Sequence, residues 1–261
     1  MRRTCIKPDI DRFPAAFHSL LDGAPVYDSS CSPEARVWLI DREGGYFLKS
    51  AAKGTLAAEA QMTAYFHQKG LGAEVLSYVS LERDWLLTAR VLGEDCTHAD
   101  VLAQPERLCN LLGEQLRMLH ELDCSDCPVQ NRMAGYRALA EENYRTGNYD
   151  KTQFPDSFGY ASAEEAWAVT RREGQLLRNE ALIHGDYCLP NVMLDDWKFS
   201  GFIDLGNGGV GDRHVDLFWG AWTLGFNLKT DRYAPRFLDA YGRDWVNTDK
   251  LRVVAAFEVF G

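Results

Sequence analysis

The chain lacks any apolar run of the length that a membrane-spanning helix needs. Its opening, Met1-Arg2-Arg3, is reminiscent of a twin-arginine export signal. The apolar stretch that such a signal requires does not follow, because Asp9, Asp11 and Arg12 interrupt it. We therefore expect no membrane partner and a cytoplasmic location.

Basic residues are in deficit: 28 Lys and Arg face 38 Asp and Glu, which gives a formal net charge of -10. This balance disfavours a nucleic-acid partner, whose phosphates need a basic surface, and suits a small cationic molecule. The 7 cysteines are odd in number and scattered, so reduced thiols are expected rather than a disulfide framework. A chain of 261 residues fits one large domain or two unequal lobes. We expect a monomer or a weak dimer.

Two familiar nucleotide-binding motifs are missing or incomplete. No G-x-x-x-x-G-K-[ST] occurs anywhere, which argues against a P-loop enzyme. Residues 206–211 match G-x-G-x-x-G, the dinucleotide-binding pattern. That pattern also needs a long helix, a returning parallel strand and an acid about 20 residues further on, and none follows convincingly. We interpret these glycines as shaping a loop, and a dehydrogenase that binds NAD stays a minor alternative.

Residues 184–206 carry the strongest positive signal. Asp186 is followed after four residues by Asn191, and Asp204 then stands in an Asp-x-Gly. This spacing is typical of the catalytic half of a protein-kinase-like site. Phosphoryl transfer needs metal ions to neutralise phosphate charge and an oxygen that positions the attacking hydroxyl. Asp186 is the candidate for that oxygen, while Asn191 and Asp204 offer the hard oxygen ligands that Mg²⁺ prefers.

The sequence around these residues predicts how they meet. Residues 191–194 and 199–203 are mostly apolar, and residues 195–198 between them have the composition of a turn. The pattern predicts a hairpin. A hairpin returns Asp204 to the neighbourhood of Asn191, so that two metal ligands distant in sequence become neighbours. The alternative, a hairpin with ordinary turn carboxylates, is disfavoured by the joint spacing.

A phosphate-binding site of this kind also needs a cation and an acid that holds it. Lys49 ends an expected strand, and Glu59 lies on the following expected helix, placed to reach back toward that strand. An ion pair would fix the ammonium as a point charge for the nucleotide phosphates. Residues 28–35 occupy the place of the glycine-rich loop of protein kinases and contain no glycine. Backbone N–H groups and small serine side chains would have to cover the phosphates.

Hydrophobic periodicity predicts strands in the first part of the chain and helices in the second. The expected strands are residues 35–41, 46–49, 75–81, 85–88 and 180–183. The expected helices are residues 10–21, 55–68, a stretch from residue 107 to about 122, 136–144, 164–177, 215–224, 233–241 and 250–260. The change near Val91 predicts a nucleotide-binding domain, residues 1–91, and a catalytic and substrate-binding domain, residues 92–261. The expected fold class is α+β: a bilobal protein-kinase-like fold, with an antiparallel sheet plus one helix in the small lobe, and a catalytic β-hairpin in the larger, mainly helical lobe.

Three segments together match one enzyme family. They are His184-Gly185-Asp186-x-Cys188-Leu189-Pro190-Asn191, Gly201-Phe202-Ile203-Asp204-Leu205-Gly206, and Leu119-His120-x-Leu122-Asp123-x-x-Asp126-Cys127-Pro128. In order and spacing the chain resembles the aminoglycoside 3'-phosphotransferases, bacterial antibiotic kinases with a protein-kinase-like fold. The resemblance implies an ATP- and Mg²⁺-dependent transfer of phosphate to an aminoglycoside hydroxyl, most often at the 3' position, which confers antibiotic resistance. GTP stays open as an alternative donor.

The resemblance also implies a role for individual residues. Asp186 would be the catalytic base, and Asn191 and Asp204 would hold two Mg²⁺ ions. The implied nucleotide contacts are Lys49 paired with Glu59 on the α- and β-phosphates, Phe47 on the adenine, Arg90 and Val91 at the hinge, and Ser32 in the loop over the phosphates. On the acceptor side, Asp186, Glu258 and the chain-end carboxylate at Gly261 would grip the cationic substrate.

The chain departs from the family pattern mainly in this acceptor half. Asn207 stands where familiar members carry Arg, and Phe226-Asn227 stands where they can place adjacent acids. Phe257-Glu258 represents their terminal Asp-Glu pair. Each lost carboxylate forfeits a charge-assisted hydrogen bond of about 1.5–3 kcal/mol to a substrate ammonium. The candidates for compensation are Asp150, Asp156, Glu164 and Glu165.

These departures keep two other functions open. One is the same phosphoryl chemistry on a different small amine or sugar metabolite. The other is a nucleotide-binding regulator without catalysis, although the presence of Asp186, Asn191, Asp204 and Lys49 disfavours it.

Overall fold

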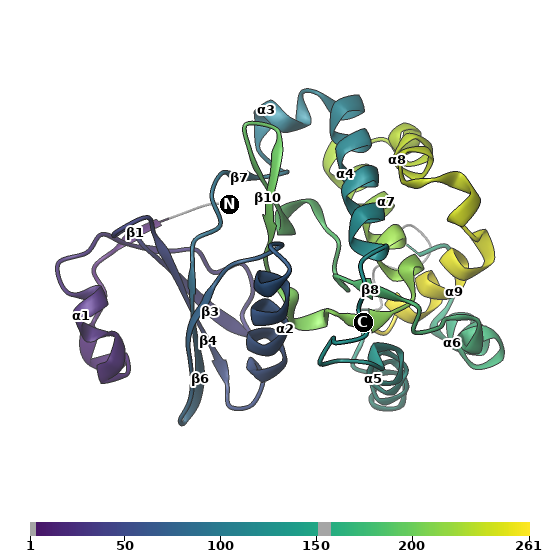
Figure 1. Ribbon diagram of the computed structural model, residues 1–261. Coiled ribbons are helices and arrows are strands. Elements are labelled where there is room, and N and C mark those ends of the chain that lie inside the picture. Colours follow the sequence, from purple (N-terminus) through teal and green to yellow (C-terminus); the bar gives the residue numbers. More distant parts are fainter. Residues whose placement is uncertain (1–3, 151–157) are drawn as a thin grey trace. The chain divides into compact units, whose positions relative to one another are not determined.

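The computed structural model describes residues 4–150 and 158–261 (Figure 1). Its contacts divide the chain into two compact units. One contains residues 1–97 and 190–206, and the other contains residues 98–189 and 207–261. The predicted functional domains, 1–91 and 92–261, stay a prediction, because this division follows contacts and not ligand binding. Asp156 lies outside the described residues.

The first unit is built on a six-stranded sheet in the order β1-β2-β3-β4-β6-β5, in which neighbouring strands are antiparallel. The strands are β1 (Thr4–Ile6), β2 (Val26–Asp28), β3 (Ala35–Ile40), β4 (Tyr46–Ala52), β5 (Val75–Ser80) and β6 (Arg83–Ala89). Apolar and aromatic side chains on the central strands explain why this segment forms a sheet. The predicted strands are confirmed to within a few residues at their ends.

The two faces of this sheet have different roles, because successive side chains of a strand point to opposite sides. Leu48 of β4 is fully buried in a core with Phe17, Ile40 and Trp85. The opposite face is covered by helix α2 (Ala57–Gln68), and Leu86 packs there in a second small core. Alternation therefore places Phe47 and Lys49 on the face that α2 covers.

The predicted helix over residues 10–21 is wrong in its first two thirds. Two 3₁₀ turns, Ile10–Arg12 and Ala15–Phe17, precede a single helical turn, α1 (His18–Leu21). Pro14 lies between the two 3₁₀ turns, and proline has no N–H to give to a continuous helix. The apolar residues of the segment still reach the core, since Phe17 and Leu21 are buried.

The predicted hairpin is present, but its contacts place it in the first unit and not in the mainly helical part of the chain for which it was predicted. Strands β9 (Val192–Asp195) and β10 (Lys198–Phe202) pair antiparallel, and β7 (Glu94–Asp95) adds to the other side of β9. Asp196 and Trp197 take the left-handed backbone conformation at the turn, with φ of 46° and 62°. The amide of Phe202 also donates to the carbonyl of Leu71, which ties the hairpin to the segment that follows α2.

The second unit is mainly helical. Its helices are α3 (Ala99–Leu102), α4 (Pro105–His120), α5 (Arg132–Thr146), α6 (Ala163–Glu173), α7 (Arg213–Leu228), α8 (Ala234–Tyr241) and α9 (Thr248–Glu258). Among the described residues, no helix is both long enough and apolar enough to cross a bilayer. The predicted helices from residue 107 onward are confirmed. The leucine stripe of α4 is buried at Leu112, Leu116 and Leu119, as the periodicity predicts.

A short two-stranded sheet shapes the second unit around residue 184. Strand β8 (Ala181–Ile183) pairs antiparallel with β11 (Gly209–Gly211). The glycine pattern at 206–211 therefore lies in a 3₁₀ turn and a short antiparallel strand. A dinucleotide-binding fold would need a parallel strand and a crossover helix there, so this arrangement argues against the NAD-binding alternative, although Gly209 and Gly211 lie in a strand and not in the predicted loop.

Candidate active site

Three charged side chains from distant parts of the sequence meet in the first unit. The Nζ of Lys49 lies 2.7 Å from Oε2 of Glu59 on α2 and 2.8 Å from Oδ1 of Asp204 after β10. Burial disfavours the ammonium, but the two carboxylates outweigh it and raise the pKa of Lys49. The lysine is therefore charged at neutral pH, as a phosphate-binding cation must be. The predicted contact between Lys49 and Glu59 is present.

The hairpin also brings the two predicted metal ligands to the same end of β9 and β10. The amide of Ile203 donates to the carbonyl of Asn191 at 3.1 Å, and Asp204 is the next residue along the chain. Asp204 has a φ of 60°, the left-handed region that a non-glycine residue enters at a cost of about 1–3 kcal/mol. The side-chain carboxylate of Asp204 and the amide oxygen of Asn191 are both ligands that suit Mg²⁺.

The other predicted nucleotide contacts lie around the sheet of the first unit. Phe47 is half-buried and shares the α2 face with Lys49. Arg90 and Val91 follow β6, and the amide of Arg90 donates to the carbonyl of Gly45. Ser32 lies in an exposed bend between β2 and β3. These positions place the residues without testing their predicted roles.

In the second unit, a buried acid that the sequence reading missed fixes the loop before Asp186. The carboxylate of Asp216 on α7 accepts the amides of His184 and Gly185, each at 2.7 Å. His120 lies 3.1 Å from the same carboxylate. Asp216 is completely buried, so the backbone of the loop is held by an acceptor that solvent does not reach. Its position in the first turn of a helix, an unremarkable place for an acid, gave no signal of this role.

The glycine of the His-Gly-Asp motif also has a structural reason. Gly185 has a φ of 81°, and a Cβ there would lie 2.0 Å from the carbonyl oxygen of Asn207. Only glycine allows this approach. The guanidinium of Arg132 in turn donates to the backbone and side-chain oxygens of Asn207, at 2.8 Å and 2.6 Å. Asn207, which stands where familiar family members carry Arg, is therefore held in place by an arginine from α5.

Glu258, the predicted acceptor-binding acid, ends helix α9. Tyr136 donates to its Oε1 at 2.7 Å, and the side chain of Trp219 forms a second hydrogen bond to it. Burial raises the pKa of Glu258 to about 7, and the two hydrogen bonds favour the charged form and limit the rise. Asp186 adds to the negative field at this carboxyl. Gly261 is exposed at the chain end, and its amide donates to the carbonyl of Glu258.

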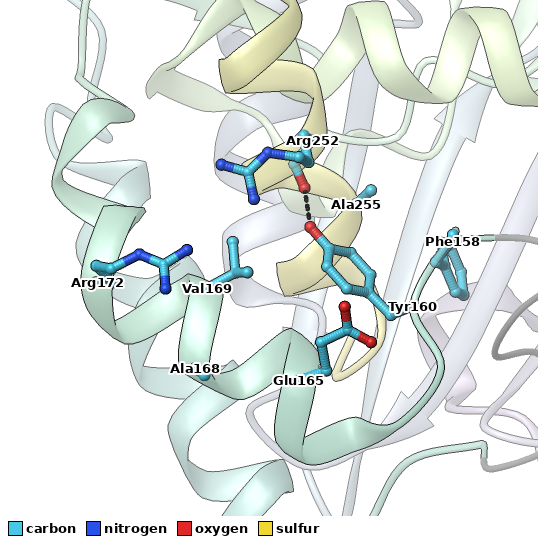
Figure 2. A pocket seen from close by; sticks show the side chains of 9 residues that line it. Phe158, Tyr160, Glu165, Ala168, Val169, Arg172, Arg252 and Ala255 are labelled. Atoms are coloured by element: carbon cyan, nitrogen blue, oxygen red, sulfur yellow. Dashed lines mark hydrogen bonds between the residues drawn. The ribbon is translucent and has the colours of Figure 1, made fainter.

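Glu165 was one of the acids expected to compensate for the lost substrate-binding carboxylates, but its surroundings do not suit a polycation. Figure 2 shows a pocket of about 500 Å³ between α6 and α9, which Glu165 shares with Arg172 and Arg252. The carboxylate of Glu165 accepts the amide of Ala161 just before α6, and the hydroxyl of Ser162 caps the helix by accepting the amide of Glu165. Two guanidinium groups in one small pocket repel a polycation. Exposed acids remain at Asp150 and Glu164.

Comparison with known proteins places the chain in a family. The model of the phosphotransferase enzyme family matches residues 27–252. The chain is 48% identical over 257 residues to the probable aminoglycoside 3'-phosphotransferase of Lactococcus lactis, covering 98% of each chain. It is 31% identical over 177 residues to the aminoglycoside 3'-phosphotransferase of Niallia circulans, covering 68% of this chain and 67% of that one.

Solved structures agree with these relatives. An aminoglycoside 3'-phosphotransferase of type VIII superposes with a TM-score of 0.76 and 26% identity, over 96% of both chains. An aminoglycoside phosphotransferase of Streptomyces rimosus, solved in complex with ADP and streptomycin, gives a TM-score of 0.74 at 23% identity, over 97% of this chain and 99% of that one. The second comparison supports the fold alone.

The fold and the site thus define a nucleotide-binding phosphotransferase of the kinase-like class. The chain belongs to the phosphotransferase enzyme family, and among its members to the aminoglycoside 3'-phosphotransferases. The resemblance drawn from the three sequence segments and the predicted fold class are confirmed.

Proposed function

We propose that this protein transfers the γ-phosphate of ATP to a hydroxyl of an aminoglycoside antibiotic, most often the 3'-hydroxyl, and so confers resistance. The observation that carries the proposal is the ammonium of Lys49 held between Glu59 and Asp204. This contact brings together Lys49, Glu59 and Asp204, three residues of the kinase pattern that come from different segments of the sequence. The identity of 48% over nearly the whole chain to a probable aminoglycoside 3'-phosphotransferase supports the acceptor class.

In the proposed reaction, the carboxylate of Asp186 accepts a hydrogen bond from the acceptor hydroxyl and orients its oxygen toward the γ-phosphorus. The proton passes to Asp186 late, when the bond between the γ-phosphorus and the leaving oxygen of ADP is largely broken. Asp216 supports this role, because it holds the backbone of His184 and Gly185 immediately before the base. Lys49 neutralises charge on the α- and β-phosphates.

The residues present fit a magnesium site. Asp204 offers a carboxylate and Asn191 an amide oxygen, and the hairpin places them at one end of two paired strands. When bound there, Mg²⁺ would neutralise the charge that develops on the phosphate oxygens. The left-handed backbone at Asp204 supports a functional assignment, since strained residues persist where function requires them.

Several further features belong to the same proposal. Residues 1–91 would bind the nucleotide, with Phe47, Ser32, Arg90 and Val91 as contacts, and residues 92–261 would carry catalysis and acceptor binding through Glu258 and Gly261. We propose a monomer or weak dimer in the cytoplasm, where ATP is available, without a nucleic-acid or membrane partner. GTP as donor is distinguished from ATP by a direct competition assay.

The proposal is tested by a screen of radiolabelled phosphate transfer from ATP to a panel of aminoglycosides, with the phosphorylated position read by NMR. Phosphorylation of kanamycin and neomycin at ordinary rates, at the 3' position, is the expected result. The loss of acids at positions 226, 227 and 257 favours one rival, a kinase for another small amine or sugar. Transfer to such metabolites but to no aminoglycoside would establish that rival, and nucleotide binding without any transfer would favour a regulator.

A further inference from the structure

Helix α7 carries three aromatic residues along one side. Trp219, Trp222 and Phe226 follow one another at intervals of three and four residues, so they lie on one side of the helix. The rings of Trp219 and Trp222 meet edge to face at 5.3 Å, and those of Trp222 and Phe226 stack at 5.1 Å with 9° between their planes. Phe226 is 56% exposed, and the two indoles are half-buried. These three residues are called the aromatic ladder below.

Two observations connect the aromatic ladder to the reacting group. The hydroxyl of Thr223, on the same side of α7, accepts the amide of Leu189 at 3.3 Å. Cys188, two residues after Asp186, interacts with both Thr223 and Asp186. This side of α7 therefore lies against the loop that carries the proposed base.

The ladder also begins at the predicted acceptor-binding acid. Trp219 interacts with the carboxyl group of Glu258, and helices α7 and α9 pack against each other. A molecule bound at Glu258 with a hydroxyl near Asp186 would thus have the indoles of Trp219 and Trp222 as neighbours. No carboxylate follows along the ladder at Phe226 or Asn227, where the family can place acids.

We propose, on the basis of the function above, that the aromatic ladder is an acceptor-binding platform that takes an amino-sugar ring. The C–H face of the ring packs on the indole of Trp222, and the indole of Trp219 borders the ring at a steep angle. The ammonium groups of the sugar gain cation–π attraction from these indoles, and Glu258 binds one ammonium directly. Phe226 acts as a positioning residue that supports the ring of Trp222. The substrates favoured are amino sugars with an open ring face, rather than the molecules with the highest charge.

The charges around the ladder agree with this substrate class. The ammonium of Lys229 lies 4.2 Å from the centre of the Phe226 ring, so the outer end of the ladder already holds a cation. A ligand with many widely spread ammonium groups would meet repulsion there, whereas a compact amino-sugar ring on the two indoles would not.

The direct test is fluorine NMR of protein labelled with 5-fluorotryptophan, with signals assigned by single Trp→Phe variants. The chain has 7 tryptophans, and Trp245 is an exposed one that serves as an internal control. Addition of kanamycin should shift the signals of Trp219 and Trp222 and leave that of Trp245 unchanged. Spermine, which carries ammonium groups without a sugar ring, should shift them far less. Equal shifts with spermine, or no shift at Trp222 with either ligand, would overturn the platform.

Kinetics give the second arm. Trp222→Ala should raise KM for kanamycin about tenfold, corresponding to about 1.4 kcal/mol, and leave KM for ATP unchanged. Trp222→Phe should keep most of the affinity, and the control Trp245→Ala should match the wild type. An unchanged acceptor KM in folded Trp222→Ala would show that the platform is wrong while the phosphotransferase function holds. A wild type that transfers no phosphate would refute the function, and the fluorine shifts would still decide the platform.

Discussion

Lys49 and Asp204 form an ion pair, with 2.8 Å between Nζ and Oδ1, although they are 155 residues apart in the sequence. Asp204 holds this position with a left-handed backbone, φ 60°. The pair links the strand that carries the proposed phosphate-binding cation to the loop that carries a proposed metal ligand. Disturbing it should therefore affect nucleotide handling more than folding.

Lys49→Met tests this relationship. The methionine keeps the stem of the side chain and removes the charge, so KM for ATP should rise and kcat should fall about 10²-fold or more, as for loss of one transition-state electrostatic contact. The acceptor KM should change little. The control is Lys53→Met, an exposed lysine just after the same strand, which should behave as wild type in steady-state kinetics. Equal kinetics for the two variants would contradict the role of Lys49.

Asp216→Asn tests the buried support of the catalytic loop. The amide keeps the shape but presents an NH₂ group and no charge to the two backbone amides that it should accept. We expect kcat to fall about 10²-fold, the size of a displacement of about 1 Å of a reacting group, with KM for ATP nearly unchanged. The control is the exposed Asp244→Asn. A wild-type kcat in folded Asp216→Asn, verified by circular dichroism, would rule out this positioning role.

Glu258 should couple acceptor binding to pH. Burial raises its pKa to about 7, above the ordinary 4.5, so the group is largely protonated below pH 7 in the folded protein. The groups that face it are Tyr136, Trp219, Asp186 and Arg132. A bound ammonium favours the carboxylate and lowers this pKa, so a proton should be released when an aminoglycoside binds near pH 7. Affinity should therefore weaken as pH falls below 7.

The proton release is measured by calorimetry of aminoglycoside binding in phosphate and in Tris, whose ionisation enthalpies differ. The wild type should show a buffer-dependent enthalpy at pH 7, and Glu258→Gln should show less. The raised pKa of Glu258 also affects the free energy of unfolding, but there low pH is favourable. The stabilising contribution of Glu258 is fully present below pH 4.5 and is lost as pH rises through about 7. No difference between the buffers for both proteins would refute the assignment.

Asp84 should stabilise the first unit. Its buried carboxylate accepts the amide of Leu56 before α2 and the hydroxyls of Tyr78 and Ser80. Burial opposes the charge, but these hydrogen bonds and one from the backbone of Gly54 lower the pKa of Asp84 to about 2. Asp84→Ala would leave the buried amide of Leu56 without its acceptor and remove the partner of two hydroxyls, at a cost of about 1–3 kcal/mol.

Urea unfolding of Asp84→Ala measures that loss, with the exposed Glu82→Ala in the same β-hairpin as control. Because the folded pKa lies below the ordinary value, the contribution of Asp84 is present above about pH 4 and is lost as pH falls through about 2. The stability difference from wild type should shrink in that range. A difference that stays constant from pH 6 to pH 2 would show that the charge of Asp84 is not what stabilises the unit.

Much of the fold and of the candidate site could be predicted from the sequence because local patterns carry them. The apolar runs at 191–194 and 199–203 around a turn predicted the hairpin, and Lys49 and Glu59 were predicted to meet from one strand and the next helix. Pro14 marked the break in the first helix, but the apolar periodicity around it concealed that break.

The remaining features depend on contacts between distant residues that leave no local pattern. Asp216 reaches the loop before Asp186 across 31 and 32 residues of sequence. The hydrogen bonds of Tyr136 and Trp219 to Glu258 likewise depend on the packing of α5, α7 and α9. The change from acids to Phe226-Asn227 was visible in the sequence. The stacking of Phe226 on Trp222 could not be predicted from the sequence.

The central claim is that Asp186 is the base of an ATP-dependent aminoglycoside kinase. The measurement that tests it most directly is radiolabelled phosphate transfer to kanamycin. The rates of the wild type and of Asp186→Ala are compared at ATP concentrations that saturate both proteins. The wild type should give a product that carries phosphate at the 3' position by NMR, and Asp186→Ala should be slower by about 10²–10⁴-fold, the usual contribution of a general base. Transfer at the wild-type rate by the variant would contradict the account.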